Sequence, residues 1–129
     1  MPDERKITNF RPTPANLEIQ ELTISRRSLK EALERAAINK KVRVVPVFNS
    51  SAAAEANIPQ YRLFEVAPES AYHLLGLRNA DVMVAANERI IVNSFIVPTF
   101  VQLLPAEQTA QIEIRREERP ILFKYTFVE

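Results

Sequence analysis

Hydrophobic and polar residues alternate in two segments near the end of the chain, which is the pattern of half-buried strands. In residues 111–115, Ile112 and Ile114 lie on one side and polar residues on the other. In residues 121–127 an isoleucine and three aromatic residues occupy every second position. The polar run 116–120 is typical of a hairpin loop, so these segments predict an antiparallel hairpin.

The residues between Ser25 and Asn39 show the periodicity of an amphipathic helix. Apolar residues recur there at spacings of three and four, and Ser25 offers a side-chain oxygen that can cap the first turn. Asn39 is expected to close the helix in a left-handed conformation. The sequence therefore predicts one amphipathic helix between these two residues, with an apolar face made of Leu29, Ala32, Leu33, Ala36 and Ala37.

The middle of the chain contains the clearest strand and turn signals. Residues 61–66 predict a short strand, residues 68–75 a turn leading into one helical loop, and residues 81–86 a buried strand. The only glycine of the chain, Gly76, lies in the link between the last two. We expect this region to organise the fold.

Two further predicted elements each contain a proline. Residues 42–48 are rich in β-branched side chains and predict a strand, but Pro46 lacks an N–H and places that strand at an edge or a bulge. Residues 93–104 predict a helix that begins near Pro98 or kinks there. In residues 17–24 the alternation is broken, which indicates only a short strand or an extended segment.

This order of elements favours an α+β domain: a small, partly open β-barrel or curled antiparallel sheet flanked by two main helices. A chain of 129 residues with 47% hydrophobic content can build one compact core. Residues 1–16 contain three prolines and show no periodicity, as in a flexible linker. The domain is therefore expected over residues 17–129, with a helical extension at its N-terminal end.

Composition excludes several functions. The chain has no cysteine, so a disulfide, a thiolate metal site and a cysteine nucleophile are excluded. A net charge of +1 without a stripe of Lys and Arg disfavours nucleic acid as a partner. No apolar run approaches the roughly 20 residues that span a bilayer, so no direct membrane insertion is expected. With one histidine in the chain, we expect neither a metal site nor a cofactor.

That histidine, His73, lies near Ser70 and Asp81, which raises the question of a catalytic triad. The sequence shows no strained nucleophile elbow and no glycine-rich oxyanion loop, and the Ser–His spacing belongs to one helical turn. We expect a surface or structural histidine, and an aspartate that accepts amides of the turn. The chain is therefore not expected to be an enzyme.

The segment Gly-Leu-Arg-Asn-Ala-Asp at residues 76–81, followed by the buried strand, resembles bacterial PDZ domains. More narrowly, it is similar to the periplasmic PDZ domain of the type II secretion inner-membrane clamp protein, general secretion pathway protein C. The resemblance extends over about residues 24–127 and includes the strand Tyr61-Arg62-Leu63-Phe64. Where that family has glycine, this chain has Ala80 and Glu88, so these turns must use asparagine or strained non-glycine residues.

A PDZ domain binds an extended peptide as an added strand, beside a helix that walls an apolar pocket. By resemblance, the edge is residues 61–66 and the wall is residues 95–104. Pro59, in the loop before that edge, has no amide hydrogen, which favours an internal segment or a folded partner over a free C terminus. The groove residues that the resemblance implies are Tyr61, Arg62, Leu63, Phe64, Phe100, Val101 and Leu104.

Alternatives remain open for several of these residues. Leu63, Phe100, Val101 and Leu104 also fit ordinary core positions. Arg62 could offer charge to a carboxylate, and equally fits a solvated strand position.

The resemblance implies a non-catalytic interaction module of a bacterial type II secretion system. Its partner would be a secreted substrate, the secretin or another secretion component. The module would lie in the periplasm, as the soluble part of an inner-membrane-anchored protein. Two alternatives remain: a regulatory peptide-binding PDZ domain of a periplasmic serine protease, and a purely structural PDZ domain that forms homo-oligomers.

Overall fold

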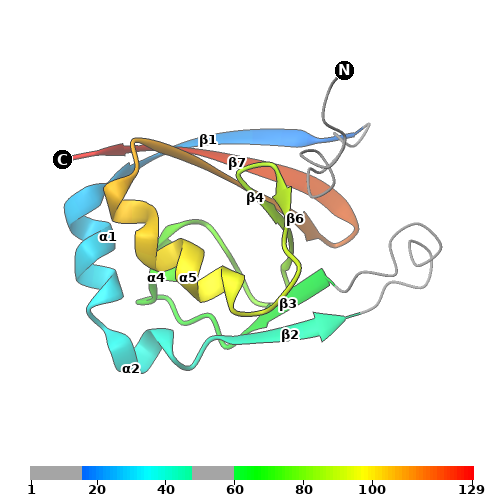
Figure 1. Ribbon diagram of the computed structural model, residues 1–129, viewed down its shortest axis with the longest axis horizontal. Helices are drawn as coiled ribbons and strands as arrows, with labels where there is room; N and C mark the ends of the chain where they lie inside the picture. Colours follow the sequence, from blue (N-terminus) through cyan, green and yellow to red (C-terminus); the bar gives the residue numbers. More distant parts are fainter. Residues whose placement is uncertain (1–15, 48–59) are drawn as a thin grey trace, which may run out of the picture.

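The computed structural model describes residues 16–47 and 60–129, which form an α+β domain with an open seven-stranded sheet and four α-helices (Figure 1). The strands are β1 (Glu18–Ser25), β2 (Arg43–Val47), β3 (Gln60–Phe64), β4 (Val82–Ala86), β5 (Arg89–Ile90), β6 (Thr109–Arg116) and β7 (Arg119–Val128). The helices are α1 (Arg26–Leu33), α2 (Ala36–Asn39), α4 (Ala71–Leu74) and α5 (Ile96–Leu103), and the 3-10 turn η2 (Leu104–Ala106) follows α5. The expected fold class is confirmed. The predicted linker at residues 1–16 lies almost wholly outside the described residues.

The sheet runs in the order β1-β7-β6-β4-β3-β2, with β5 paired to β4. All pairings are antiparallel except that of β1 with β7, so the sheet is mixed. The weak pattern at residues 17–24 forms a full strand of 8 residues. Its inward residue Ile24 lies opposite Phe127, within the row of aromatic side chains on β7.

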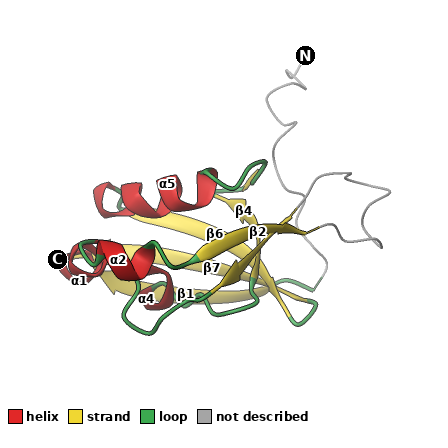
Figure 2. Ribbon diagram, turned by 90° about the horizontal axis from the view of Figure 1, so that it is seen from below, coloured by secondary structure: helices red, strands yellow, loops and turns green. Residues whose placement is uncertain are grey.

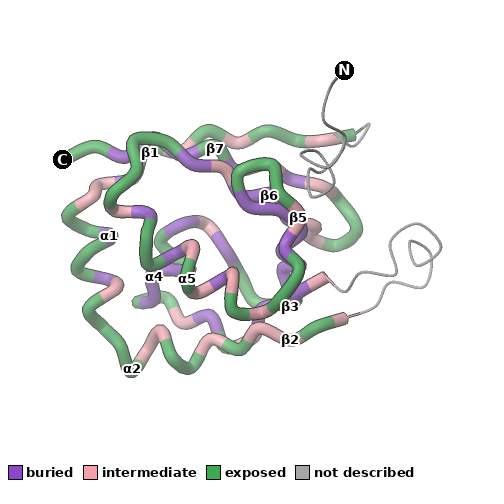
Figure 3. Tube along the Cα trace, viewed as in Figure 1, coloured by how far each residue is buried: buried purple, intermediate pink, exposed green. Residues whose placement is uncertain are grey.

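The hydrophobic core lies between the curled sheet and the helices. Figure 2 shows α5 running alongside the strands, with α1, α2 and α4 gathered near one end of the sheet. The buried stretches of the trace in Figure 3 follow β4, β6 and β7. On β7 the rings of Phe123, Tyr125 and Phe127 stack with centroids 6.0 Å apart. This aromatic row gives the sheet its inward face.

The single helix expected between Ser25 and Asn39 is two helices. Ser25 caps α1 as predicted, because its Oγ accepts the Ser28 N–H at 3.1 Å. Asn39 is the last residue of α2 and does not have the expected left-handed backbone. Its side-chain amide instead donates to the Ala32 carbonyl at 2.7 Å and accepts the Ala71 N–H at 2.9 Å. The Asn39 side chain thereby provides a donor for a carbonyl at the end of α1 and connects that end to α4.

Both prolines lie where a missing N–H is tolerated. Pro46 is on β2, the outermost strand at one edge of the sheet. Pro98 is the third residue of α5, within the first turn, where N–H groups have no intrahelical acceptor. The two predictions made from these prolines are confirmed.

Several tight turns have non-glycine residues with positive φ, as the missing glycines predict. Ala80 has φ 72° and Glu88 has φ 70°. The hairpin between β6 and β7 is shorter than the polar run suggests, since only Glu117 and Glu118 lie outside the strands, at φ 53° and 69°. Two successive positive φ values are the geometry of a type I′ turn.

Replacing Ala80 by Gly is expected to raise the free energy of unfolding by up to about 1 kcal/mol. A residue with a Cβ in the left-handed conformation costs roughly 1–2 kcal/mol, which glycine avoids. Glycine also gives the unfolded chain more conformational entropy, which lowers this gain by about 0.5–1 kcal/mol. Chemical denaturation measures the change. Gly76→Ala is the matched opposite: its Cβ would have ordinary contacts of 3.5 Å with Leu22 and Phe123, but φ +89° makes it destabilising. If both substitutions changed the free energy of unfolding in the same direction, this explanation would be contradicted.

Candidate functional site

The expected peptide-binding strand is not an edge of the sheet. β3 pairs with β2 on one side and with β4 on the other. The expectation that residues 61–66 offer a free edge is therefore wrong, because both sides of this strand are already paired. The outermost strand on this side is β2.

β2 presents hydrogen-bonding groups at its open side. On β3, Leu63 donates its N–H to the Asp81 carbonyl and accepts the Ala80 N–H, so both of its backbone groups point toward β4. Val44 lies opposite Leu63 and therefore belongs to a non-hydrogen-bonded pair. Its N–H and C=O point away from β3, where a further strand could pair. Two residues on, Pro46 has the same orientation, which explains why a residue without an N–H fits there.

A groove of about 280 Å³ lies beside this edge. β2 and α5 form its two sides, and residues of α1, α2 and α4 close it. The lining residues are Leu33, Ala36, Asn39, Lys40, Val42, Val44, Tyr72, Pro98, Val101 and Gln102. Pockets that bury drug-sized molecules commonly hold about 300–1,000 Å³, so this groove suits a few side chains of an extended segment better than a whole small molecule.

The predicted groove residues do not lie together. Val101 lines the groove, although its side chain is almost fully buried. Leu63 and Leu104 are core residues with 0% and 1% exposure. Tyr61 is also buried in the core, and Phe100 packs against it from the outer side of α5. For Leu63 and Leu104, the alternative interpretation as ordinary core residues is confirmed.

Arg62 and Phe64 lie on the other face of the sheet. They alternate with the core residues Tyr61 and Leu63 along β3, so they project away from α5. Arg62 is partly buried, and solvent does not reach its Nε. The interpretation of Arg62 as a solvated strand residue is therefore wrong.

Sequence reasoning missed Val42, Val44, Lys40 and Tyr72 as groove residues. Pro46 was the signal that could have found them, because a proline within a strand marks an edge. Lys40 is the one charged side chain among the described residues of the lining. Burial raises the pKa of Tyr72 to about 12, so its hydroxyl keeps its proton at neutral pH and can donate a hydrogen bond.

The segment before β2 has no backbone amides available for a terminal carboxylate. The N–H groups of Lys40, Lys41 and Val42 donate to the carbonyls of Ala36, Ile38 and Asn39 respectively. Carboxylate capture in a backbone nest needs inward-pointing amides that are not already bonded. The loop before β3 that contains Pro59, which was expected to disfavour carboxylate binding, lies mostly outside the described residues.

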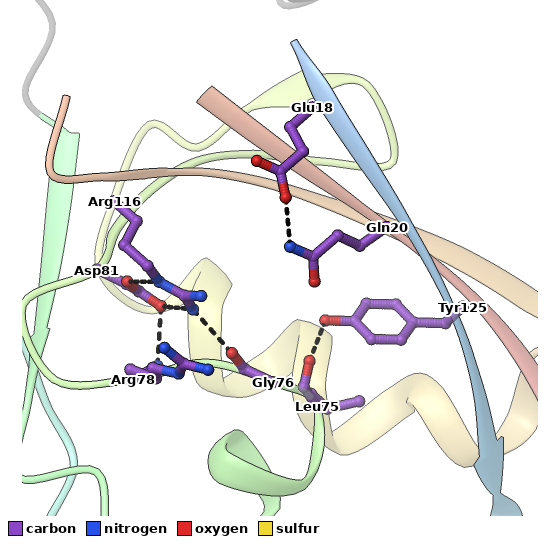
Figure 4. A network of polar contacts seen from close by, with 8 residues as sticks. All are labelled: Glu18, Gln20, Leu75, Gly76, Arg78, Asp81, Arg116 and Tyr125. Carbon is purple, nitrogen blue, oxygen red and sulfur yellow. Dashed lines mark hydrogen bonds and ion pairs between the residues drawn. The ribbon is translucent and has the colours of Figure 1, made fainter. Parts of the chain in front are cut away.

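Asp81 is the centre of a buried polar network (Figure 4). Its carboxylate accepts the Arg78 N–H at 2.8 Å, as predicted, and pairs with Arg116 through contacts of 2.8 and 2.7 Å. Arg116 also donates to the Gly76 carbonyl at 2.9 Å. Beside this network, the buried Tyr125 hydroxyl donates to the Leu75 carbonyl at 2.6 Å, and burial raises the pKa of that hydroxyl.

Ser70, His73 and Asp81 do not form a triad. The Ser70 Oγ caps α4 by accepting the His73 backbone N–H at 3.1 Å, and it donates to the Ala67 carbonyl. The His73 side chain is exposed, and Asp81 is engaged by Arg116. These residues stabilise the turn and the short helix.

Two other kinds of feature are absent from the described part of the chain. Residues 16–47 and 60–129 contain no group of three or more His, Cys, Asp or Glu side chains that could hold a metal ion. In the same residues, no helix has the length and apolar character needed to cross a bilayer.

No family model and no curated protein matches the chain. Among the solved structures that are similar to it are two described as the PDZ domain of EpsC from Vibrio cholerae. The first, residues 204–305, is 16% identical with a TM-score of 0.44, and the match covers 79% of this chain and 98% of that one. The second, residues 219–305, is 18% identical with a TM-score of 0.41, and the match covers 70% and 98%. Both matched chains are PDZ domains.

Proposed function

We propose that this chain is a non-catalytic protein-interaction module that binds an extended internal segment of a partner protein as an added strand on β2. The observation that carries the proposal is the open edge at Val44, next to an apolar groove walled by α5. Backbone hydrogen bonds at such an edge give affinity, and side chains of alternate ligand residues enter the groove and give specificity.

The edge offers more acceptors than donors, which determines what a ligand strand must supply. Val44 supplies one N–H, whereas Pro46 has none and the Val42 N–H is bonded to Asn39. The carbonyls of all three residues can accept. A ligand strand must therefore supply N–H groups at alternate positions, and proline is excluded at those positions.

By the resemblance of residues 76–81, the module belongs to a type II secretion system, where it contacts secreted substrates, the secretin or another secretion component in the periplasm. It would be the soluble part of an inner-membrane-anchored protein. A regulatory domain of a periplasmic serine protease is the alternative assignment. The coding sequence upstream separates them: a membrane-spanning helix supports the first, and a trypsin-like domain supports the second.

Selection from a displayed library of ten-residue internal segments tests the proposal. Selected peptides, synthesised with both ends capped, are titrated into the ¹⁵N-labelled chain. Amide shifts are expected at Val42 and Val44 on β2 and at Val101 and Gln102 on α5. Shifts confined to other surfaces would refute binding in the groove.

Val44→Pro is the matching variant. It removes the one outward N–H but no hydrogen bond to β3, so the chain should stay folded while the dissociation constant rises about five- to tenfold, the value of one hydrogen bond. Val45→Pro is the control, because Val45 belongs to the hydrogen-bonded pair with Arg62 and proline there removes a ladder bond. Unchanged peptide affinity in Val44→Pro would rule out strand addition at this edge.

Self-association is a second candidate, favoured by the apolar outer side of α5. Phe95 is 79% exposed and Leu103 is 60% exposed, beside Ile96 and Phe100. Among the described residues that line this patch none is charged, so two copies can face each other without repulsion. Sedimentation at rising concentration measures this, with Phe95→Ser as the variant that should remove any dimer.

A further inference from the structure

The groove beside β2 has one charged end. Lys40, the residue that follows α2, lines this groove together with Val42 and Val44, which come shortly after it in the chain. Figure 1 shows α2 at the start of β2, so the lysine belongs to that end of the groove. Lys40 is exposed, whereas the two valines are partly buried. A side chain of a partner can therefore reach the Lys40 ammonium, which is carried on a flexible four-carbon chain.

Among the described residues that line the groove, none is negatively charged. Burial raises the pKa of Tyr72 to about 12, so its hydroxyl adds no negative charge at neutral pH. Around Lys40 the sequence is basic, because residues 35–43 contain two arginines and two lysines but no acidic residue. Arg43 has the carboxylate of Glu65 at 3.9 Å, but α5 on the opposite side of the groove contains no charged residue. The groove is thus positively charged at the α2 end and uncharged elsewhere in its described lining.

We propose that Lys40 makes the groove selective for an extended protein segment in which an apolar and an acidic residue occupy alternate positions. This inference rests on the proposed strand addition at β2 and names the class of ligand for that site. A ligand residue directly opposite Val44 shares its face, so its side chain enters the apolar part of the groove. The ligand residue two positions nearer α2 faces the same way, about 7 Å further along, beside Lys40. An acidic side chain there pairs with the ammonium, whereas a basic one meets a like charge.

The lining suits one acidic side chain and not a polyanion. A phosphate backbone needs several cations along an extended surface, and the described lining of this groove contains one. The direction of the ligand strand decides the order of its two selected residues. In a strand antiparallel to β2 the acidic residue follows the apolar residue, and in a parallel strand it precedes it. Both orders are therefore included in the experiment.

Two capped peptides test this selectivity. The probes are acetyl-Ser-Val-Thr-Val-Thr-Glu-Ser-amide and the peptide of reversed sequence, each also made with Gln or Lys in place of Glu. Amide shifts of Val42 and Val44 in the ¹⁵N-labelled chain give the dissociation constants. For one of the two orders we expect the Glu peptide to bind about two- to fivefold more tightly than its Gln form, the value of one exposed ion pair, and the Lys form to bind most weakly.

The outcomes separate this inference from the proposed function. Equal affinities of the Glu and Gln forms would overturn the selectivity and leave strand addition standing. The same holds if neither Glu peptide shifts the amides of Val42 and Val44 while peptides selected from the library do. If no peptide of either kind shifts these amides, the inference and the proposed function both fail.

Charge reversal makes the test specific to one lysine. Lys40→Glu is expected to invert the order, so that the Lys peptide binds more tightly than the Glu peptide. Lys41→Glu is the matched control, because it makes the same change at the next residue, which is exposed and lies outside the described lining. This control should keep the wild-type order. An unchanged order in Lys40→Glu, or inversion by both variants, would overturn the assignment to Lys40. Lys40→Gln, which should equalise the Glu and Gln peptides, decides the matter if the reversal prevents folding.

Discussion

Replacing Asp81 by Asn is expected to lower the free energy of unfolding by about 3–5 kcal/mol, the cost of removing one partner from a buried ion pair. Asp81 is 1% exposed and Arg116 is 14% exposed, with 2.7 Å between Nη2 and Oδ2. The substitution keeps the shape of the side chain but leaves the arginine charge without its counter-ion. Urea denaturation at neutral pH measures the difference.

The control for this prediction is Glu118→Gln. Its carboxylate also pairs with an arginine, Arg115 at 3.7 Å, but it is 84% exposed, and exposed pairs contribute only about 0–1 kcal/mol. A double substitution that also changes Arg116 to Met should recover part of the loss, because it removes the uncompensated charge. Similar costs for Asp81→Asn and Glu118→Gln would mean that burial of the pair does not decide its contribution.

This network gives the Gly-Leu-Arg-Asn-Ala-Asp segment a structural role. Gly76 turns the chain at φ +89° and offers its carbonyl to Arg116. The Asn79 side chain accepts the Val66 N–H at 2.7 Å, and Asp81 accepts the Arg78 N–H. The side chains of Asn79 and Asp81 thus both stabilise the turn between α4 and β4. The motif that carries the family resemblance thus stabilises the fold and does not line the groove.

Local patterns predicted the elements whose signals are themselves local. The hairpin of β6 and β7 follows from alternation, and the cap at Ser25 follows from the preference of serine for that position. β1 was underestimated because its main partner, β7, lies about a hundred residues away and pairs with it in parallel. No pattern within residues 17–24 contains that information.

The groove was misplaced for a related reason. A family motif at Tyr61-Arg62-Leu63-Phe64 suggested the ligand strand, but which strand is outermost depends on the pairing of the whole sheet. Pro46 already indicated an edge at β2, and that physical signal was more informative than the resemblance. The charge of Arg62 was noticed in the sequence, whereas its place beside Arg115 across β4 required the register of three strands.

Replacing Leu63 by Ala is expected to lower the free energy of unfolding by about 2–5 kcal/mol, as for other fully buried leucines. Its side chain is 0% exposed within the core cluster, so truncation leaves a cavity that no ligand side chain can fill. Val44→Ala is the matched control. Val44 is only partly buried and lines the groove, so its truncation should cost less stability.

Peptide binding should show the opposite order. Val44→Ala is expected to weaken binding of a groove-selected peptide, whereas Leu63→Ala, assayed at low temperature where it stays folded, should bind as the wild type does. The two substitutions together therefore separate core from groove on β3 and β2. If Leu63→Ala lost peptide affinity while keeping its stability, β3 would be the ligand strand after all, and the sheet would have to open between β2 and β3 to admit the peptide.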